Sequence, residues 1–341
     1  MKIIVDAMGG DNAPDEIVCG ALSAARDGIA DIMLVGRGED ILRAIERSGS
    51  SELPKGVEIV NASEVIEIED DPSNAVRIKK DSSLTVALSQ LRDGHGDALV
   101  SAGSTGAILS GATLIVKRVK GIRRAALAPV IPSSCGGFVL IDCGANTECT
   151  AEYLLQFAFM GSFYAEDTLK ISNPRVGLLN IGTERTKGTQ LQLETFELLD
   201  KACRESTLNF IGNIEAKDAV KGACDVLVTD GFSGNVLLKS MEGMASFIMS
   251  EIKGLFMKNA LTKLSALLIK KHISGLRAKM DPDKIGGTAM LGISKPVIKA
   301  HGSSNAAAIC SAIRQASVAA GTDLAARLQE NMANMKIDTP V

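Results

Sequence analysis

The sequence predicts an α/β fold, a three-layer αβα sandwich built around a mainly parallel sheet. Short apolar runs recur along the 341 residues, and each is rich in β-branched residues and continuous rather than alternating. Strands of this kind are buried on both faces, which is typical of a parallel sheet covered by helices on either side. Longer segments with helical spacing separate the runs, which lie at residues 3–5, 32–35, 57–60, 98–100, 139–141, 176–179, 208–211 and 226–228.

Length and composition favour one large domain in a reducing compartment. Apolar residues make up 46% of the chain, so we expect residues 1–341 to form a single large α/β domain. The seven cysteines include no Cys-x-x-Cys pair, which indicates reduced thiols and no structural metal site. The chain start lacks the apolar core of a signal peptide, and no apolar stretch approaches the ~18 residues of a membrane-spanning helix. We therefore expect a cytoplasmic protein.

Charge is distributed unevenly along the chain. Residues 252–280 contain seven Lys or Arg and no Asp or Glu, and removing that +7 from the net charge of −3 leaves −10 for the rest. Apolar residues have helical spacing from Phe256 onward, so we expect residues 245–280 to be a basic amphipathic helical segment. It suits an anionic membrane surface, a second subunit or an acidic protein partner, and these alternatives stay open. The expected contact residues are Phe256, Leu261, Leu264, Leu268, Lys263, Lys270 and Lys271.

Polar turns that contain glycine follow six of the predicted strands. In open parallel sheets, ligands bind outside the carboxyl ends of the strands. One such turn is ordinary loop chemistry, but six at equivalent places indicate a shared cleft. The turns lie at residues 6–12, 101–106, 142–146, 180–184, 212–215 and 229–235.

Two of these turns carry chemistry that can be weighed in detail. The 101–106 turn offers backbone N–H groups and two hydroxyls at a predicted helix start, which suits an anion, although a simple capped helix is the alternative. It lacks the spacing of a P-loop, and no Gly-x-Gly-x-x-Gly follows the first strand, so we expect no nucleotide cofactor. Asp230 is either a general base or the cap of the next helix. Ser233 nearly forms a nucleophile elbow, but position 235 is Asn.

Five segments closely resemble the motifs of the PlsX-type phosphate acyltransferases, in order along the chain up to about residue 325: residues 6–11, 101–107, 180–184, 229–235 and 301–304. The resemblance implies transfer of a fatty acyl group from acyl carrier protein to inorganic phosphate, without a cofactor. The acyl phosphate product would enter glycerophospholipid synthesis through a glycerol-3-phosphate acyltransferase. The resemblance also implies a fold similar to isocitrate and isopropylmalate dehydrogenases and to phosphotransacetylase, and a homodimer associated peripherally with the membrane.

The expected reaction is direct attack of phosphate on the thioester, with no covalent enzyme intermediate. The turns would accelerate this reaction by orienting the two reactants and by stabilising the oxyanion that develops. Lys187, Asn180 and Asn235 would polarise the acyl oxygen or phosphate. Asp230 would orient phosphate or accept its proton. The expected phosphate and substrate contacts are Asp6, Gly9, Gly10, Asp11, Ser104, Thr105, Gly106, Asn146, Thr183, Ser233 and His301.

The sequence also departs from the family motif at one place and leaves two other functions to be weighed. Residues 146–148 read Asn-Thr-Glu, where the family pattern leads us to expect Asn-Val-Asp.

The first alternative function is that of a dehydrogenase of the same fold, which would need a nicotinamide site and usually a cluster of metal-binding carboxylates. The second is a non-catalytic membrane scaffold that recruits enzymes of lipid synthesis. We expect no nucleic-acid partner.

The basic segment generates a first prediction. Reversing the charges of Lys263, Lys270 and Lys271 should weaken binding to anionic lipid or to acyl carrier protein, because each Lys near an anionic surface contributes about 1 kcal/mol. Vesicle sedimentation and the apparent affinity for the carrier are the measurements. Unchanged values in both would refute a binding role for this segment.

Overall fold

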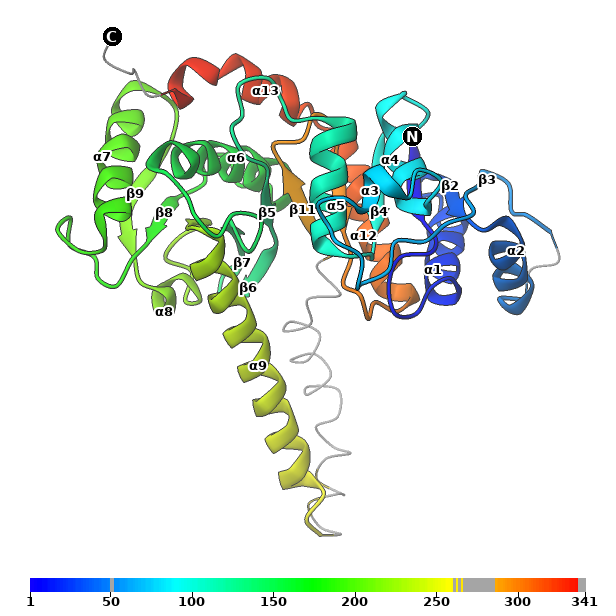
Figure 1. Cartoon of the computed structure of the whole chain (residues 1–341). Helices are drawn as coiled ribbons and strands as arrows, with labels where there is room; N and C mark the ends of the chain where they lie inside the picture. The colour runs from blue at the N-terminus through cyan, green and yellow to red at the C-terminus, as the bar shows by residue number, and fades with distance from the viewer. Residues whose placement is uncertain (50–51, 260–261, 263–264, 266–285, 337–341) are drawn as a thin grey trace.

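The computed structural model describes residues 1–49, 52–259, 262, 265 and 286–336. Two lobes, each built on its own β-sheet, lie side by side, and one long helix, α9, projects away from them (Figure 1). The first sheet has seven strands and the second has five. The α/β fold class is confirmed, whereas the strands that the sequence assigned to one sheet are divided between two.

The seven-stranded sheet has the order β3-β2-β1-β4-β12-β11-β5. Its strands pair in parallel, except that β11 runs antiparallel to both of its neighbours. Three strands of the centre, β1, β4 and β12, are consecutive and parallel, so their carboxyl ends meet at one edge. The bounds are β1 (Lys2–Asp6), β2 (Asp31–Gly36), β3 (Val57–Asn61), β4 (Ala98–Ser101), β5 (Ala126–Ala128), β11 (Thr288–Leu291) and β12 (Val297–Lys299).

The five-stranded sheet has the order β6-β7-β10-β8-β9, and only the pair β6–β7 is antiparallel. The carboxyl ends of β7, β10 and β8 therefore also meet at one edge. The sequence placed a strand at residues 208–211, but β9 starts later, so Gly212 and Asn213 lie inside the strand rather than in a turn after it. The bounds are β6 (Val130–Ser133), β7 (Gly136–Ile141), β8 (Val176–Leu179), β9 (Phe210–Ile214) and β10 (Val226–Val228).

Helices cover both faces of the sheets and complete the three layers. Ile3 and Val5 of β1 belong to one core cluster with α1, α2, α6, α7 and α12, whereas Ile4 between them belongs to a second cluster with α4, α5, α8 and α9. Each cluster runs through both sheets. The longer helices are α1 (Asp15–Arg26), α2 (Gly38–Arg47), α4 (Ser83–Arg92), α6 (Ala151–Leu169), α7 (Gln190–Glu205), α9 (Gly231–Phe256) and α12 (Ala306–Ala320). The shorter ones are α3 (Ala75–Ile78), α5 (Thr105–Gly111), η1 (Ala112–Val116), α8 (Ala216–Ala219), α13 (Leu324–Glu330) and η2 (Met332–Met335).

Helix α9 starts at the second sheet, after β10, and then leaves the body (Figure 1). Of its 26 residues, the buried ones are Gly231 and Gly234. Its exposed large apolar side chains are Phe232, Val236, Met244, Phe247, Ile248 and Leu255. The helix ends at Phe256, which is half-buried, and the chain turns before Asn259, whose side chain accepts a hydrogen bond from the Thr262 backbone.

The other predicted contact residues of the basic segment, which are Leu261, Lys263, Leu264, Leu268, Lys270 and Lys271, lie outside the described residues. Within the part of the chain that the structure describes, no helix combines the length and the apolar character needed to cross a bilayer.

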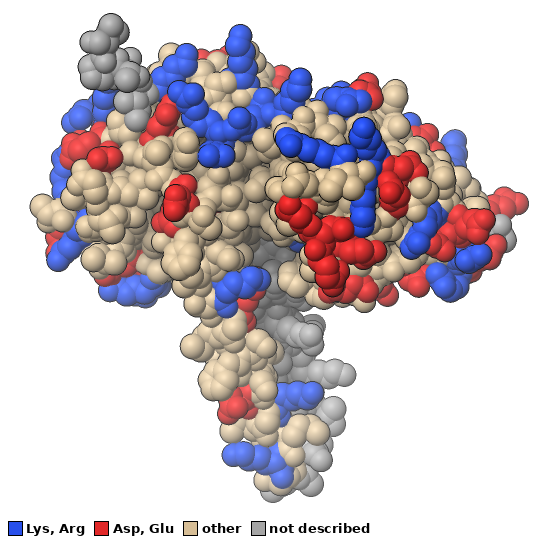
Figure 2. Space-filling model, viewed as in Figure 1, with Lys and Arg blue, Asp and Glu red and all other residues tan. Residues whose placement is uncertain are grey.

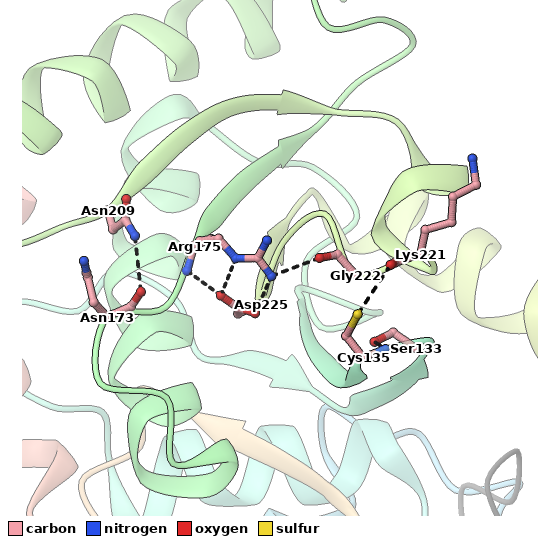
Figure 3. A network of polar contacts seen from close by, with 8 residues as sticks. All are labelled: Ser133, Cys135, Asn173, Arg175, Asn209, Lys221, Gly222 and Asp225. Carbon is pink, nitrogen blue, oxygen red and sulfur yellow. Dashed lines mark hydrogen bonds and ion pairs between the residues drawn. The ribbon is translucent and has the colours of Figure 1, made fainter.

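A polar network fixes the amino ends of the second sheet (Figure 3). Arg175, just before β8, donates from its side chain to both carboxylate oxygens of Asp225, just before β10, at 3.0 and 2.9 Å. The backbone N–H of Arg175 also donates to Asp225, and its guanidinium reaches the carbonyl of Gly222. Burial alone would raise the pKa of Asp225, but the hydrogen bonds and charge of Arg175 outweigh it and hold that pKa below its usual range. The network lies at the edge opposite the carboxyl-end turns, so its role is structural.

The Arg175–Asp225 pair generates a prediction about stability. Asp225→Asn should lower the free energy of unfolding by about 1 kcal/mol at pH 7, because it weakens charged hydrogen bonds that are partly buried. A carboxyl with a lowered folded-state pKa stabilises the fold above its unfolded pKa of about 3.9, and this contribution disappears as pH falls through the folded value. The difference from wild type should therefore shrink between pH 7 and about pH 3 in urea titrations.

The matched control is Glu205→Gln, which removes an exposed carboxylate 3.9 Å from Lys201. Its cost should stay below about 0.5 kcal/mol, as for other surface pairs. Equal costs for the two variants would contradict a special role for Asp225.

Candidate functional site

Two of the predicted turns, at residues 6–12 and 101–106, form a first cluster with the chain after β12, at the carboxyl ends of β1, β4 and β12. The turns touch through their backbones, since Asp11 N–H donates to the carbonyl of Gly302 at 2.8 Å. Gly9 faces Gly103 so closely that a Cβ atom on Gly9 would lie 2.7 Å from the Gly103 nitrogen. Gly10 has a φ of 103°, which side-chain-bearing residues rarely adopt. The sequence predicted the first two of these turns, and the structure places residues 301–304 beside them.

Asp6 holds this cluster in place from inside. Its side chain is 2% exposed and accepts hydrogen bonds from Ser101 Oγ at 2.7 Å and from Met8 N–H at 3.3 Å. Burial raises the pKa of Asp6, and hydrogen bonds from Ser83 and Ser101 oppose that shift. A carboxylate so enclosed orders the turns around it, and the direct phosphate contact expected from the sequence stays a prediction.

The remaining predicted residues of the first cluster line its surface. Ser104 stands before α5, and Thr105 and Gly106 form its first turn; all three are half-buried. Ser104 makes no side-chain capping hydrogen bond. Asp11 and His301 are exposed, and the His301 ring nitrogen lies 2.8 Å from Ser303 Oγ.

The second cluster lies at the carboxyl ends of β7, β10 and β8, and Asp142 organises it. This carboxylate is wholly buried and accepts the backbone N–H groups of Leu127 and Asn146 at 2.9 and 2.7 Å. It also accepts the Asn146 side-chain amide at 2.9 Å. Burial raises its pKa, and these hydrogen bonds oppose the rise. The sequence placed Asp142 in a polar turn but did not single it out, because nothing in a turn sequence tells whether a carboxylate points inward.

Asn146 links Asp142 to the start of α9. Its side-chain amide also donates to the carbonyl of Ala125 at 2.8 Å, and its own carbonyl accepts Gly231 N–H at 2.7 Å. A Cβ atom on Gly234 would lie 1.9 Å from the Asp142 carbonyl, so glycine is required where α9 meets this turn. Asn146 therefore positions the first turn of α9.

Asp230 is the N-cap of α9. A helix cap was one of the two roles that the sequence analysis gave for this residue. Its carboxylate is largely buried and accepts Ser233 N–H at 2.8 Å. Ser233 is half-buried and Asn235 is exposed, and both sit in the first turn of the helix. Asn235 lies beside Gly144 of the neighbouring turn.

Asn180 closes the loop that carries Lys187. It donates to the carbonyl of Lys187 at 3.0 Å and accepts Ile181 N–H at 2.8 Å. Asn213, inside β9, supports the same loop by donating to the carbonyl of Glu184 at 2.8 Å. Lys187 and Thr183 are exposed, and the stem of Lys187 lies over Gly182. The loop thus presents Lys187 while Asn180 is used internally.

Lys299 is a site residue that the sequence analysis missed. It ends β12 opposite Ser101 of β4, is half-buried, and donates to the carbonyl of Ala300 at 3.0 Å. Burial lowers its pKa first, the charge of Lys239 on α9 lowers it further, and Asp11 opposes both. Lys299 is thus a partly buried cation that feels the charges of Asp11 in the first cluster and of Lys239 on α9. Its position at the end of an apolar strand, two residues before His301, was the signal that could have found it.

Comparison with other proteins shows the family. Residues 1–327 match the family model described as fatty acid synthesis protein. A phosphate acyltransferase of Thermoanaerobacter pseudethanolicus is 47% identical over 336 residues, which cover 98% of each chain. A phosphate acyltransferase of Oceanobacillus iheyensis is 46% identical over 317 residues, or 93% of this chain and 92% of its own.

Solved structures share the fold at much lower identity. A phosphotransacetylase from Streptococcus pyogenes superposes with a TM-score of 0.66 at 18% identity and covers 94% of both chains. A 4-hydroxythreonine-4-phosphate dehydrogenase from Klebsiella pneumoniae gives a TM-score of 0.53 at 10% identity, over 94% of this chain and 99% of its own. Acyltransferases and dehydrogenases thus use one architecture, and sequence identity decides between them. The chain belongs to the phosphate acyltransferase family of fatty acid synthesis proteins, and it is an acyltransferase.

Proposed function

We propose that the protein transfers a fatty acyl group from acyl carrier protein to inorganic phosphate, releasing acyl phosphate and the free carrier. The observation that carries this proposal is that polar turns gather at the carboxyl ends of both sheets, with the partly buried cation Lys299 at the end of β12 in the first cluster. A cation whose pKa is lowered by burial and by a neighbouring lysine is stabilised when an anion binds beside it. Phosphate supplies that anion.

The phosphate subsite is assigned to the first cluster. The turns at Gly9–Asp11 and Ser104–Gly106 bring backbone N–H groups together, and such concave groups of donors attract anions. Lys299 adds a positive charge at the same edge of the sheet. Asp6 keeps the two turns in contact from below, and the exposed His301 and Ser303 form the rim.

The acyl subsite is assigned to the second cluster. Lys187 and Asn235 are exposed on neighbouring elements and can donate to the acyl oxygen. Donors that are already in place where negative charge develops are worth roughly 3–4 kcal/mol each. Asp230, Asn146 and Asn180 act by positioning, since each is engaged in backbone hydrogen bonds.

The reaction then proceeds by direct attack. A phosphate oxygen bonds to the thioester carbonyl carbon, and the electron pair of the C=O bond moves onto the acyl oxygen. Collapse of this intermediate breaks the C–S bond, which leaves acyl phosphate and the carrier thiolate. A thiol has a pKa of about 8.5 and leaves readily, so orientation of the two reactants, worth ~7–11 kcal/mol, is the main requirement.

The projecting helix supports the rest of the proposal. Helix α9 carries exposed apolar side chains on a stem outside the body (Figure 1). Exposed apolar surface of this kind marks contact with a membrane or with a second subunit. We propose that the protein is a cytoplasmic homodimer that associates peripherally with the membrane and delivers acyl phosphate to a glycerol-3-phosphate acyltransferase.

The rival functions have weaker support. The dehydrogenase named above shares only the fold at 10% identity, whereas the named acyltransferase relatives reach 47%. A scaffold without catalysis would not require glycines packed as closely as Gly9 against Gly103.

The acyl subsite predicts the behaviour of Lys187. Purified protein should release the carrier thiol from acyl carrier protein only when phosphate is present, as followed with a thiol-reactive chromophore. Lys187→Ala should lower kcat about 100-fold, because it removes one oxyanion donor. Lys201→Ala, on the exposed face of α7, is the matched control and should keep full activity. A Lys187→Ala protein as active as the control would remove Lys187 from the mechanism.

Lys299 predicts a pH dependence. Its pKa is lowered, so the ammonium loses its proton below the ordinary lysine value of about 10.4. The KM for phosphate should therefore rise as pH increases toward that value in the wild type. Lys299→Met should show a high KM at all pH values, whereas Lys299→Arg should keep a low KM without the rise, because guanidinium stays charged. If the KM for phosphate depended on pH in the same way in all three proteins, Lys299 would not be the phosphate-binding cation.

A further inference from the structure

A second basic surface lies outside both clusters and outside the segment at 245–280. We call it the basic arc and define it as Lys117, Arg118, Lys120, Arg123 and Arg124. These five cations occur within eight residues that contain no Asp or Glu, and all five are exposed. The two large apolar residues among them, Val119 and Ile122, are buried. The arc therefore presents charge and no apolar surface.

The arc is held rigidly on the body. Val119 N–H donates to the carbonyl of Gly292 at 3.0 Å, and the carbonyl of Lys117 accepts Ser294 N–H at 2.9 Å. The Arg118 guanidinium donates to the carbonyl of Arg123. A charged surface that is ordered before binding loses less entropy when a partner docks.

Most of the charge on the arc is not neutralised. Arg123 pairs with Glu152 at 3.2 Å, which is the one ion pair of the arc among the described residues. Arg124 lies over the Tyr153 ring, 5.6 Å from its centroid. Figure 2 shows Lys and Arg side chains gathered along the upper margin of the body, where the chain between α5 and β5 passes in Figure 1. Such a surface attracts a partner of opposite charge.

The arc is joined directly to the second cluster. Arg124 precedes Ala125, whose carbonyl accepts the Asn146 side chain at 2.8 Å, and the Asn146 carbonyl accepts Gly231 N–H at 2.7 Å. A partner seated on the arc therefore sits beside the turn that positions the start of α9. By contrast, the far end of α9 lies on the other side of the body from the basic arc (Figure 1).

We propose that the basic arc is the docking surface for acyl carrier protein, an acidic protein, and this inference rests on the proposed function. The arc has the complementary charge and adjoins the acyl subsite. It lacks exposed large apolar side chains, and it faces away from the outer half of α9, which carries four of the six exposed large apolar side chains of that helix. A soluble acidic protein fits these features better than a bilayer, into which apolar side chains would insert.

The test uses the full-length protein with Lys117→Glu and Lys120→Glu combined. Neither lysine touches the two clusters, and neither has an ion-pair partner in the described part of the chain. The KM for acyl carrier protein thioester should rise about tenfold while kcat stays within about twofold, since docking charges act on encounter rather than on chemistry. The difference from wild type should narrow as ionic strength rises from about 0.05 to 0.3 M.

The matched control combines Lys55→Glu and Lys170→Glu. It makes the same charge change at exposed lysines elsewhere, and Lys170 shares the positive φ of Lys117. Its KM should stay within about twofold of wild type.

Three outcomes would overturn the inference. An unchanged KM in an otherwise active variant would overturn the arc alone and leave the proposed function standing. A wild-type protein that releases no thiol in the presence of phosphate would remove the proposed function, and the arc assignment with it. Loss of sedimentation with anionic phosphatidylserine vesicles, at unchanged KM, would assign the arc to lipid instead.

Discussion

Two buried carboxylates, Asp6 and Asp142, determine how the site is built. Each stands at the carboxyl end of a strand, and removing it from water is costly unless hydrogen bonds replace the lost hydration. Backbone N–H groups and neighbouring polar side chains supply those bonds. Satisfying each carboxylate forces the adjacent turns to fold over it, and the close contact at Gly9 and Gly234 follows. Each of the two sheets thus has one buried carboxylate that orders the turns at the carboxyl ends of its strands.

The hydrogen bonds around these carboxylates distinguish two kinds of residue: those that position the turns, and those whose side chains are free to touch a substrate. Asp230, Asn146 and Asn180 have side chains engaged in hydrogen bonds to the backbone. Lys187 and Asn235 stand on the turns that these residues fix, and their side chains reach solvent. An inner layer of hydrogen-bonded residues that fixes the turns which carry the exposed donors is the arrangement that preorganised electrostatic catalysis requires.

The sequence predicted eight of the twelve strands that the structure describes and most of the turns that follow them, because buried parallel strands leave a strong continuous pattern. It did not predict β5, β6, β11 or β12, which are short and pair in part antiparallel; Pro132 even lies within β6. The division into two sheets was missed for the same reason, since those strands border the junction. Sequence also could not tell which strand-end carboxylates turn inward, so it predicted Asp6 as a ligand contact without its buried hydrogen bonds and did not single out Asp142.

Charge and apolar surface are placed on different sides of the molecule, and this has consequences for the order of events. The basic arc adjoins Ala125 and Asn146, on the side away from the end of α9. A water-soluble acyl donor and a product with an apolar tail have opposite requirements, because the donor is held by charge and the product by burial of its chain. If donor and product used one surface, each would exclude the other. Under the proposed function, separate surfaces for the two would allow a new carrier to dock while the acyl product is still leaving toward α9.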